Sequence, residues 1–439
     1  MVKPSSKTIV VIGALIISVI GLLLYVFVPS VSGLEESKEA TKVYFADHIS
    51  PAHQIVIDRF NELHKGSIEV VAVDLPFSKF STNERKELLA RSLRSRSDCL
   101  DMFSVDYVWG PRFAKWSEPL DQYIAMDQRK WILDQALKSC MYEDTLVALP
   151  LYIDVGMLYY RRDLLRHLPD GAVVEERLKK SITWDELVRL RTRLGFGKKP
   201  FYIFQANDYE GLVCNYFELV EQRDTDFINQ RPPDLTRPSA RIALKTMVDF
   251  VRKECISPPE VTEFDEILSY RYMLDHDAMF VRGWPSFLRN LSKMYGDTAK
   301  LANIGRAALP HIAGKKPASV IGGWMVMVSK YSGKKKEAME FVRFLQTKES
   351  QETFYEAGGF LPINAQVYGD SAFMKRFPDL AYYRQLLNNG FQRPSLVDYT
   401  RISDIISHYV HVAIKGEIGV NEALQRAAEM IRLNKVLIK

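Results

Sequence analysis

Residues 43–75 read "VYFADHISPAHQIVIDRFNELHKGSIEVVAVDL", and this stretch decides the predicted fold. An apolar run at 43–49 predicts a strand, and residues 51–66 have the periodicity of an amphipathic helix that ends at a glycine. A second apolar run at 68–75 predicts another strand. A strand, a helix and a strand in this order are typical of parallel strands joined by a helical crossover.

The same alternation continues beyond this stretch. Residues 83–96 predict a second helix and residues 99–106 a third strand, which together favour an α/β fold. Within the first helix, we expect Ile55, Phe60 and Leu63 to share one apolar face.

Three aspartates follow the predicted strands. Asp47 and Asp106 end the first and third strands, and Asp154 follows a strand further along the chain. Ligands of such sheets bind at the carboxyl ends of the strands, so these side chains are candidate ligand contacts.

Asp154 belongs to the stretch "LPLYIDVGMLYYRRDLL" at residues 149–165. Side chains alternate along a strand, so Ile153 and Val155 should share one face while Tyr152 and Asp154 share the other. The pattern fits an ordinary half-exposed strand with a solvated aspartate. It also fits an aromatic ring and a carboxylate that face a ligand together.

The composition is that of an ordinary globular protein. The chain has 439 residues, of which 47% are hydrophobic and 26% charged, and its formal net charge of +5 is well mixed along the sequence. The length predicts two or three domains. No long basic run carries aromatic residues, so nucleic acid is not an expected partner.

The N-terminal segment differs from the rest. Residues 9–28 contain no charged residue and are long enough to span a bilayer as a helix. We therefore predict that residues 1–34 form either a cleaved signal segment or an uncleaved single-pass anchor, and we favour the anchor because its apolar core exceeds that of a signal peptide. The rest of the chain would lie outside the cell (inner) membrane, in the periplasm or the extracellular space.

Motifs for catalysis and for metal binding are missing from the sequence. It contains no GxSxG, HExxH, Walker or complete GxGxxG pattern, so we expect neither an enzyme nor a cofactor. His408 and His411 are three positions apart on a predicted helix, and we interpret them as an ordinary polar helix face. The cysteines are far apart in the sequence, and we interpret them as buried free thiols, although one or two disulfides would also be compatible with an extracellular location.

Aromatic residues lie next to chain breakers in several segments. These segments are "VDYVWGP" at 105–111, "VRGWPSF" at 281–287 and "GGWMV" at 322–326. Aromatic rings beside carboxylates suit a sugar, whose ring presents flat C–H faces and a rim of hydroxyl groups.

These segments, taken in order, resemble the extracellular solute-binding proteins of bacterial sugar ABC importers, specifically the trehalose/maltose-binding type. The resemblance spans residues 41–435. It rests on "VDYVWGPRFAKWSEPLDQYI", "ALPLYIDVGMLYYRRDLL", "TWDELV", "YEGLVCNYFELV", "ISPP", "RGWPSF", "ALPHIAGKKPASVIGGWMVMVSKYS" and "RPSLVDYTRISDIISHYVHVAIKGEIGVNEAL".

The resemblance implies two α/β lobes that are joined by a hinge and enclose the ligand between them. The N-lobe would comprise residues 41–152 and 310–362, and the C-lobe residues 153–309 and 363–439. Ligand binding would shift the population toward a closed form. The implied function is to bind a di- or oligosaccharide and deliver it to the permease subunits of an ABC importer, with the binding domain acting as a monomer.

The family motifs also imply individual ligand contacts. Asp106 and Asp154 would accept hydrogen bonds from sugar hydroxyls, Tyr152 would stack beside Asp154, and Arg393 would donate to paired hydroxyls. The remaining implied contacts are Arg85, Trp284, Gly322, Gly323 and Trp324. The family commonly has a ligand-binding glutamate near the first strand, and this chain has none, so Asp47 or His48 is expected to substitute.

Other classes of function remain open at this point. The same fold could serve as a ligand-sensing module for a membrane receptor or kinase. The tyrosine pairs at 159–160 and 382–383 could form an iron(III) site, and a pair of carboxylates could make a glycosidase.

Overall fold

A computed structural model describes residues 39–437, apart from 77–78, 80–81, 97–98, 293–294 and 297. The predicted membrane segment at 9–28 therefore lies outside the described residues. Within the described part of the chain, no helix combines the length and apolar character that a membrane crossing requires.

The first of two main sheets contains the stretch that decided the predicted fold. Its strands are β1 (Thr41–Asp47), β2 (Ile68–Asp74), β3 (Met102–Asp106), β6 (Leu149–Val155), β11 (Ser319–Val328) and β12 (Gly390–Phe391). The order is β12-β11-β3-β1-β2, and β6 also pairs with β11. β1 runs parallel to β2 and β3, as the alternation of strands and helices predicted. β11 is antiparallel to both β3 and β6, so the sheet is mixed.

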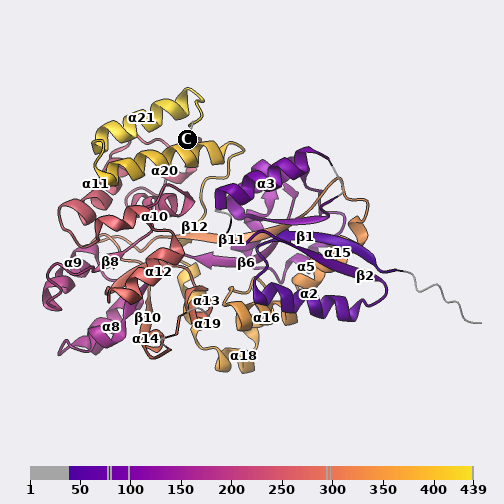
Figure 1. Cartoon of the computed structure of the whole chain (residues 1–439), viewed down its shortest axis with the longest axis horizontal. Coiled ribbons are helices and arrows are strands. Elements are labelled where there is room, and N and C mark those ends of the chain that lie inside the picture. The colour runs from indigo at the N-terminus through magenta and orange to yellow at the C-terminus, as the bar shows by residue number, and fades with distance from the viewer. Residues whose placement is uncertain are drawn as a thin grey trace, which may run out of the picture.

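The second main sheet has four strands in the order β10-β7-β9-β8. They span β7 (Met157–Arg161), β8 (Tyr202–Ile203), β9 (Phe280–Gly283) and β10 (Ile304–Ala307). A separate short pair joins β4 (Met141–Tyr142) to β5 (Thr145–Leu146). We call the part of the chain around the six-stranded sheet the first lobe and the part around the four-stranded sheet the second lobe. Figure 1 shows the two lobes side by side, with β6, β11 and β12 in the middle.

Helices surround both sheets (Figure 1). In the first lobe they are α2 (Pro51–Leu63), α3 (Thr82–Arg94), α4 (Gly110–Phe113), α5 (Met126–Arg129), α6 (Asp134–Ser139), α15 (Lys335–Leu345), α16 (Lys348–Gly358), α17 (Ala365–Gly369) and α18 (Ser371–Arg376). Elsewhere they are α7 (Arg162–Leu165), α8 (Gly171–Lys180), α9 (Trp184–Arg193), α10 (Glu210–Glu221), α11 (Pro238–Arg252), α12 (Glu266–Asp275), α13 (Phe287–Ser292), α14 (Thr298–Ala302), α19 (Asp379–Leu387), α20 (Tyr399–Lys415) and α21 (Val420–Arg432). Short 3-10 turns are η1 (Tyr107–Trp109), η2 (Ala114–Trp116), η3 (Phe227–Asn229) and η4 (Pro259–Glu263).

The apolar face predicted for the first helix is wrong in two of its three residues. Ile55 is 49% exposed and Leu63 52% exposed, whereas Phe60 is fully buried. The face that α2 packs against the protein consists of Ala52, His53, Val56, Ile57 and Phe60. The pattern misled because a buried histidine occupies a position on the inner face, where an apolar residue was expected.

β6 and β11 connect the two lobes. β6 leads through Gly156 directly into β7 of the second lobe, and the Gly156 backbone N–H donates to the Val320 carbonyl of β11 over 3.0 Å. At its other end β11 pairs with β3 in the first lobe. The residues of β6 and β11 that lie between the sheets therefore also lie between the lobes.

Candidate ligand-binding site

Asp47 ends β1 and lies in a buried polar group. The carboxylate Oδ1 accepts a hydrogen bond from Arg85 Nη2 of α3 over 3.0 Å, and its Oδ2 lies 3.5 Å from His53 Nε2. The other ring nitrogen of His53 lies 2.7 Å from Ser50 Oγ. Burial lowers the pKa of His53 to about 4, so this imidazole is neutral near pH 7. Asp47 thus has a charged partner within the protein.

Arg85 also covers one face of the Trp324 ring, which the sequence predicted to be a ligand contact. Its guanidinium carbon lies 4.4 Å from the centre of the Trp324 ring, and Trp109 contacts that ring edge to face at 6.0 Å. Trp324 is only 8% exposed, because β11 places it opposite Asp106 of β3 on one side and Tyr152 of β6 on the other. This register brings three of the predicted contacts to one point of the sheet.

Asp106 joins the two lobes through Arg393. Arg393 Nη2 donates to Asp106 Oδ1, and Nη1 donates to Glu210 Oε1 of α10, both over 2.7 Å. The hydroxyls of Tyr399 and Ser403 donate to the same glutamate. Burial raises the pKa of Asp106, and the charge of Arg393 opposes that shift. The ion pair therefore holds the end of β3 against the second lobe.

Tyr152 lies between these groups. Its ring stacks on Phe360 at 4.4 Å, and the carboxylates of Asp47, Asp154 and Asp106 act with its burial to raise its pKa, whereas the charge of Arg85 opposes them. Ile153 and Val155 are fully buried on the opposite face of the strand, as the period-2 pattern predicted. The strand is not half-exposed, because both of its faces are covered.

Asp154 differs from the other carboxylates of this region. Its Oδ1 is buried and has no hydrogen-bond partner among the described residues. Burial raises the pKa of this carboxyl to about 8, the negative charge of Asp106 adds to the shift, and Arg282 opposes it. A buried carboxylate oxygen without a donor is unfavourable, so a ligand that donates a hydrogen bond to Asp154 would stabilise the site.

Trp284 approaches Asp154 from the second lobe. It follows β9, and its indole N–H donates to Glu266 over 3.3 Å while the Arg282 guanidinium lies 3.9 Å from its ring centre. A Cβ on Gly322 would lie 3.2 Å from the Trp284 ring and 3.5 Å from the Cβ of Asp154. Glycine at 322 therefore lets the indole pack against β11 directly beside Asp154.

The glycine pair was predicted to offer backbone amides to a ligand, and the structure gives both residues a role within the protein. Gly322 and Gly323 lie in β11 opposite Asp154 and Ile153 of β6. Gly323 has a φ of +135°, and a Cβ there would lie 2.5 Å from the Tyr152 carbonyl oxygen. Their absent side chains allow close contact between β6, β11 and the surrounding rings.

The ten predicted residues thus meet between the lobes. We call this group of Asp47, Arg85, Asp106, Tyr152, Asp154, Trp284, Gly322, Gly323, Trp324 and Arg393 the strand-end cluster. Sequence reasoning missed His53, Glu210 and Glu266, which contact members of the cluster. His53 was missed because it lies within the pattern of an amphipathic helix. Glu210 and Glu266 were missed because they lie in the first turns of helices, where acidic residues are common.

Other predicted candidates have separate partners. The hydroxyls of Tyr159, Tyr160 and Tyr382 donate to the Trp284 carbonyl, Glu175 and the Lys179 carbonyl, and Tyr383 accepts from Arg306. His408 and His411 contact Asp208 and the Ala206 carbonyl. No group of three His, Cys, Asp or Glu side chains among the described residues could hold a metal ion. None of the four cysteines is in a disulfide, in agreement with the prediction, but Cys99 and Cys255 are exposed, so burial was a wrong prediction for these two.

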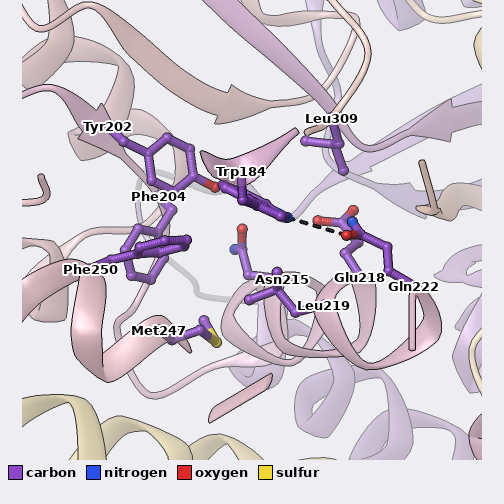
Figure 2. Close-up of a pocket in the computed structure, with 10 residues that line it drawn as sticks. All are labelled: Trp184, Tyr202, Phe204, Asn215, Glu218, Leu219, Gln222, Met247, Phe250 and Leu309. Carbon is purple, nitrogen blue, oxygen red and sulfur yellow. Dashed lines mark hydrogen bonds between the residues drawn. The ribbon is translucent and has the colours of Figure 1, made fainter. Parts of the chain in front are cut away.

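A small cavity lies inside the second lobe (Figure 2). It is lined by aromatic and polar side chains, and the Trp184 indole N–H donates to Gln222 over 3.2 Å. The space holds about one water molecule. We regard it as a packing defect of the core, because it is too small for a ligand and contains none of the strand-end cluster.

These features define a two-lobed binding protein, and comparisons with known proteins agree. Residues 56–381 match the family model described as bacterial extracellular solute-binding protein, and the chain belongs to this family. A protein of Deinococcus radiodurans described as a "probable ABC transporter-binding protein" is 26% identical over 355 residues, which cover 78% of this chain and 82% of the relative.

Solved structures show the same two-lobed fold. Maltose-bound MalE3 of T. maritima has a TM-score of 0.80 and 25% identity, with coverage of 90% of this chain and 100% of that chain. A solute-binding protein of Thermotoga lettingae bound with α-D-tagatose has a TM-score of 0.75 and 20% identity, with coverage of 90% and 99%. Members of the family act outside the cytoplasmic membrane as binding proteins, which agrees with the lack of catalytic motifs.

The raised pKa of Asp154 predicts how stability depends on pH. Between about pH 4 and 8 the unfolded chain has released the Asp154 proton while the folded protein retains it, so this group lowers the free energy of unfolding as pH rises through that window. Asp154→Asn removes the effect. We expect the unfolding temperature of this variant to exceed that of the wild type by more at pH 8 than at pH 5. An equal difference at both pH values would show that Asp154 is solvated in the unliganded protein.

Proposed function

We propose that the protein binds a sugar between its two lobes and delivers it to the permease subunits of an ABC importer. The observation that carries the proposal is Asp154, a half-buried residue between the lobes whose buried Oδ1 has no hydrogen-bond partner among the described residues. Sugar hydroxyls are hydrogen-bond donors and suit this oxygen. The relative with 25% identity that binds maltose supports a sugar as the class of ligand.

Within this proposal the members of the strand-end cluster have different roles. Asp154 contacts the ligand, and Trp284 and Tyr152 provide the ring surfaces beside it. Asp106 and Arg393 hold the lobes together, because each is the ion-pair partner of the other. Asp47 and Arg85 form the corresponding pair within the first lobe and orient Trp324.

The location of the binding domain follows from the sequence of the N-terminal segment. We propose that residues 9–28 anchor the chain in the cytoplasmic membrane with the two lobes outside it. The apolar length of this segment and the lysines at 3 and 7 support that orientation. In cells, the full chain should fractionate with membranes and resist carbonate extraction, whereas a chain that begins at residue 35 should not. Release of the full chain by carbonate would contradict the anchor.

Thermal unfolding tests the binding function. We would titrate the full chain with monosaccharides, disaccharides, oligosaccharides and polyols, in a polyoxyethylene detergent because maltoside detergents are themselves sugars. A ligand at about 100 times its dissociation constant adds about 2.7 kcal/mol to the free energy of unfolding, and the unfolding temperature should rise by a few degrees. The proposal predicts this rise for one class of sugar. No rise with any sugar or polyol would contradict it.

A further inference from the structure

We infer that the ligand is an amino sugar, whose protonated amine lies against Asp154 and whose hydroxyl groups face the arginines of the site. This inference rests on the proposed function and deepens it, because it names the chemical class of the ligand. It follows from two properties of the strand-end cluster and its direct partners: the balance of buried charge and the polar atoms that have no partner.

Carboxyl groups outnumber cations around the strand-end cluster, and Asp106, Asp154 and Glu266 among them are half-buried. Six carboxyl groups belong to the cluster, contact one of its members, or pair with an arginine that does, and they face three guanidinium groups. The carboxyl groups are those of Asp47, Asp106, Asp154, Glu210, Glu218 and Glu266, and the guanidinium groups are those of Arg85, Arg282 and Arg393. The region would therefore carry three excess negative charges if every carboxyl group were ionised.

The neighbouring titratable groups do not correct this imbalance. Burial lowers the pKa of both His48 and His53, so neither imidazole supplies a positive charge near neutral pH. Lys86 of α3 is buried, and its positive charge is shared among Asp404, Glu87 and Glu210, so it compensates Glu210 only in part. Asp74, which is exposed at the end of β2, adds a further negative charge.

The guanidinium groups are distributed unevenly among the carboxyl groups. Arg85 forms an ion pair with Asp47, and Arg393 forms ion pairs with both Asp106 and Glu210. Arg282 donates two hydrogen bonds to Glu218. Asp154 and Glu266 are left without an arginine partner, although the Trp284 indole N–H donates to Glu266. The Asp154 oxygen that has no donor lies beside Trp284, and the nearest cation to that ring, Arg282, forms its hydrogen bonds with Glu218 instead.

A neutral hydroxyl could donate to Asp154, but it would not compensate the charge. Burial raises the pKa of Asp154 and Glu266, so without a cation these two carboxyl groups tend to bind protons. A protonated amine donates to Asp154 and favours its ionised form at the same time.

Two buried donors indicate that the ligand also carries oxygen acceptors. Arg393 Nε and Arg282 Nη1 are buried and have no hydrogen-bond partner among the described residues, and the two side chains are 3% and 0% exposed. Hydroxyl oxygens can accept from such donors, whereas a simple alkylamine cannot. A polyhydroxylated amine thus matches both the acceptor and the donors of the site.

The test compares matched sugars that differ only in the amine. We would measure dissociation constants for glucosamine, glucose and N-acetylglucosamine, for the corresponding trios derived from galactose and mannose, and for chitobiose in its free-amine and N-acetylated forms beside cellobiose. The full chain in a polyoxyethylene detergent is titrated at about pH 6.5, where the amines are protonated. Asp154→Asn is measured in parallel, with Asp127→Asn, an exposed residue on α5, as the matched control.

The inference predicts that at least one free amine binds about tenfold or more tightly than both its neutral parent and its N-acetyl form. Asp154→Asn should abolish this preference, and Asp127→Asn should retain it. Equal or tighter binding of the neutral sugars overturns the inference while the proposed function stands. A preference for the amine that survives in Asp154→Asn also overturns it. If none of these sugars binds while another sugar raises the unfolding temperature, the inference is overturned and the proposed function stands; if no sugar or polyol binds in either experiment, both are overturned.

Discussion

Replacing Gly323 by alanine is expected to destabilise the protein strongly. Residue 323 has a φ of +135°, which side-chain-bearing residues rarely adopt, and such strain costs about 1–3 kcal/mol. The new Cβ would also lie 2.5 Å from the Tyr152 carbonyl oxygen and 2.6 Å from the Tyr107 ring. These two groups cannot easily separate, because the Tyr107 hydroxyl donates to the same carbonyl over 2.8 Å.

We expect a loss of about 3 kcal/mol or more in the free energy of unfolding for Gly323→Ala, measured by chemical denaturation. Gly333→Ala is the matched control, since its φ is not in the left-handed region and a Cβ there meets no atom within 4 Å. A loss for Gly323→Ala no larger than that of the control would show that β6 and β11 can separate at this point. The close packing between the lobes described above would then be wrong.

The second large effect is expected at Glu218. Its Oε1 accepts from Arg282 Nη2 over 2.7 Å and from the Val320 backbone N–H of β11 over 3.1 Å, and its Oε2 accepts from Arg282 Nε over 3.2 Å. The Arg282 side chain is 0% exposed and that of Glu218 5% exposed. Glu218→Ala would leave the guanidinium buried without its carboxylate and release the end of β11.

Removing one partner of such a buried pair costs about 3–5 kcal/mol, and we expect Glu218→Ala to lower the free energy of unfolding by that amount. Glu349→Ala removes one of the two partners of the exposed Arg59 and should leave the free energy of unfolding nearly unchanged. Similar losses in the two variants would indicate that Arg282 reaches water or another acceptor once Glu218 is absent. The anchoring of β11 to the second lobe would then not depend on this pair.

Much of the first lobe could be predicted from the sequence. The runs at 43–49 and 68–75 correspond to β1 and β2, each within two residues at both ends, because apolar strands between breakers give a clear local pattern. The stretch "SITWDEL" at 181–187 also has the local pattern of a capping box, and the structure contains this box, with the Glu186 N–H donating to Thr183 Oγ1 and the Thr183 N–H donating to Glu186 Oε2. Both features depend on residues that are close in the chain.

The contacts between the lobes could not be predicted in this way. Arg393 is 287 positions from Asp106 and 183 positions from Glu210, and no local pattern relates residues at such distances. The family resemblance pointed to Asp106 and Arg393 as separate ligand contacts, and the structure shows that they bind each other. Likewise, β11 pairs antiparallel with β3 and β6 because the chain reverses direction between the lobes. The hydrophobic periodicity of the sequence does not reveal such reversals.

The central claim is tested most directly by the dissociation constant of the Asp154→Ala variant. This constant is compared with that of the wild type, for the sugar that stabilises the protein most. Hydrogen bonds to a charged group contribute about 1.5–3 kcal/mol, so calorimetric titration should show binding weakened by about 10- to 150-fold. The unfolding temperature of the unliganded variant should not fall, because the buried Oδ1 of Asp154 has no hydrogen-bond donor among the described residues. An unchanged dissociation constant would contradict a ligand site at Asp154 between the lobes.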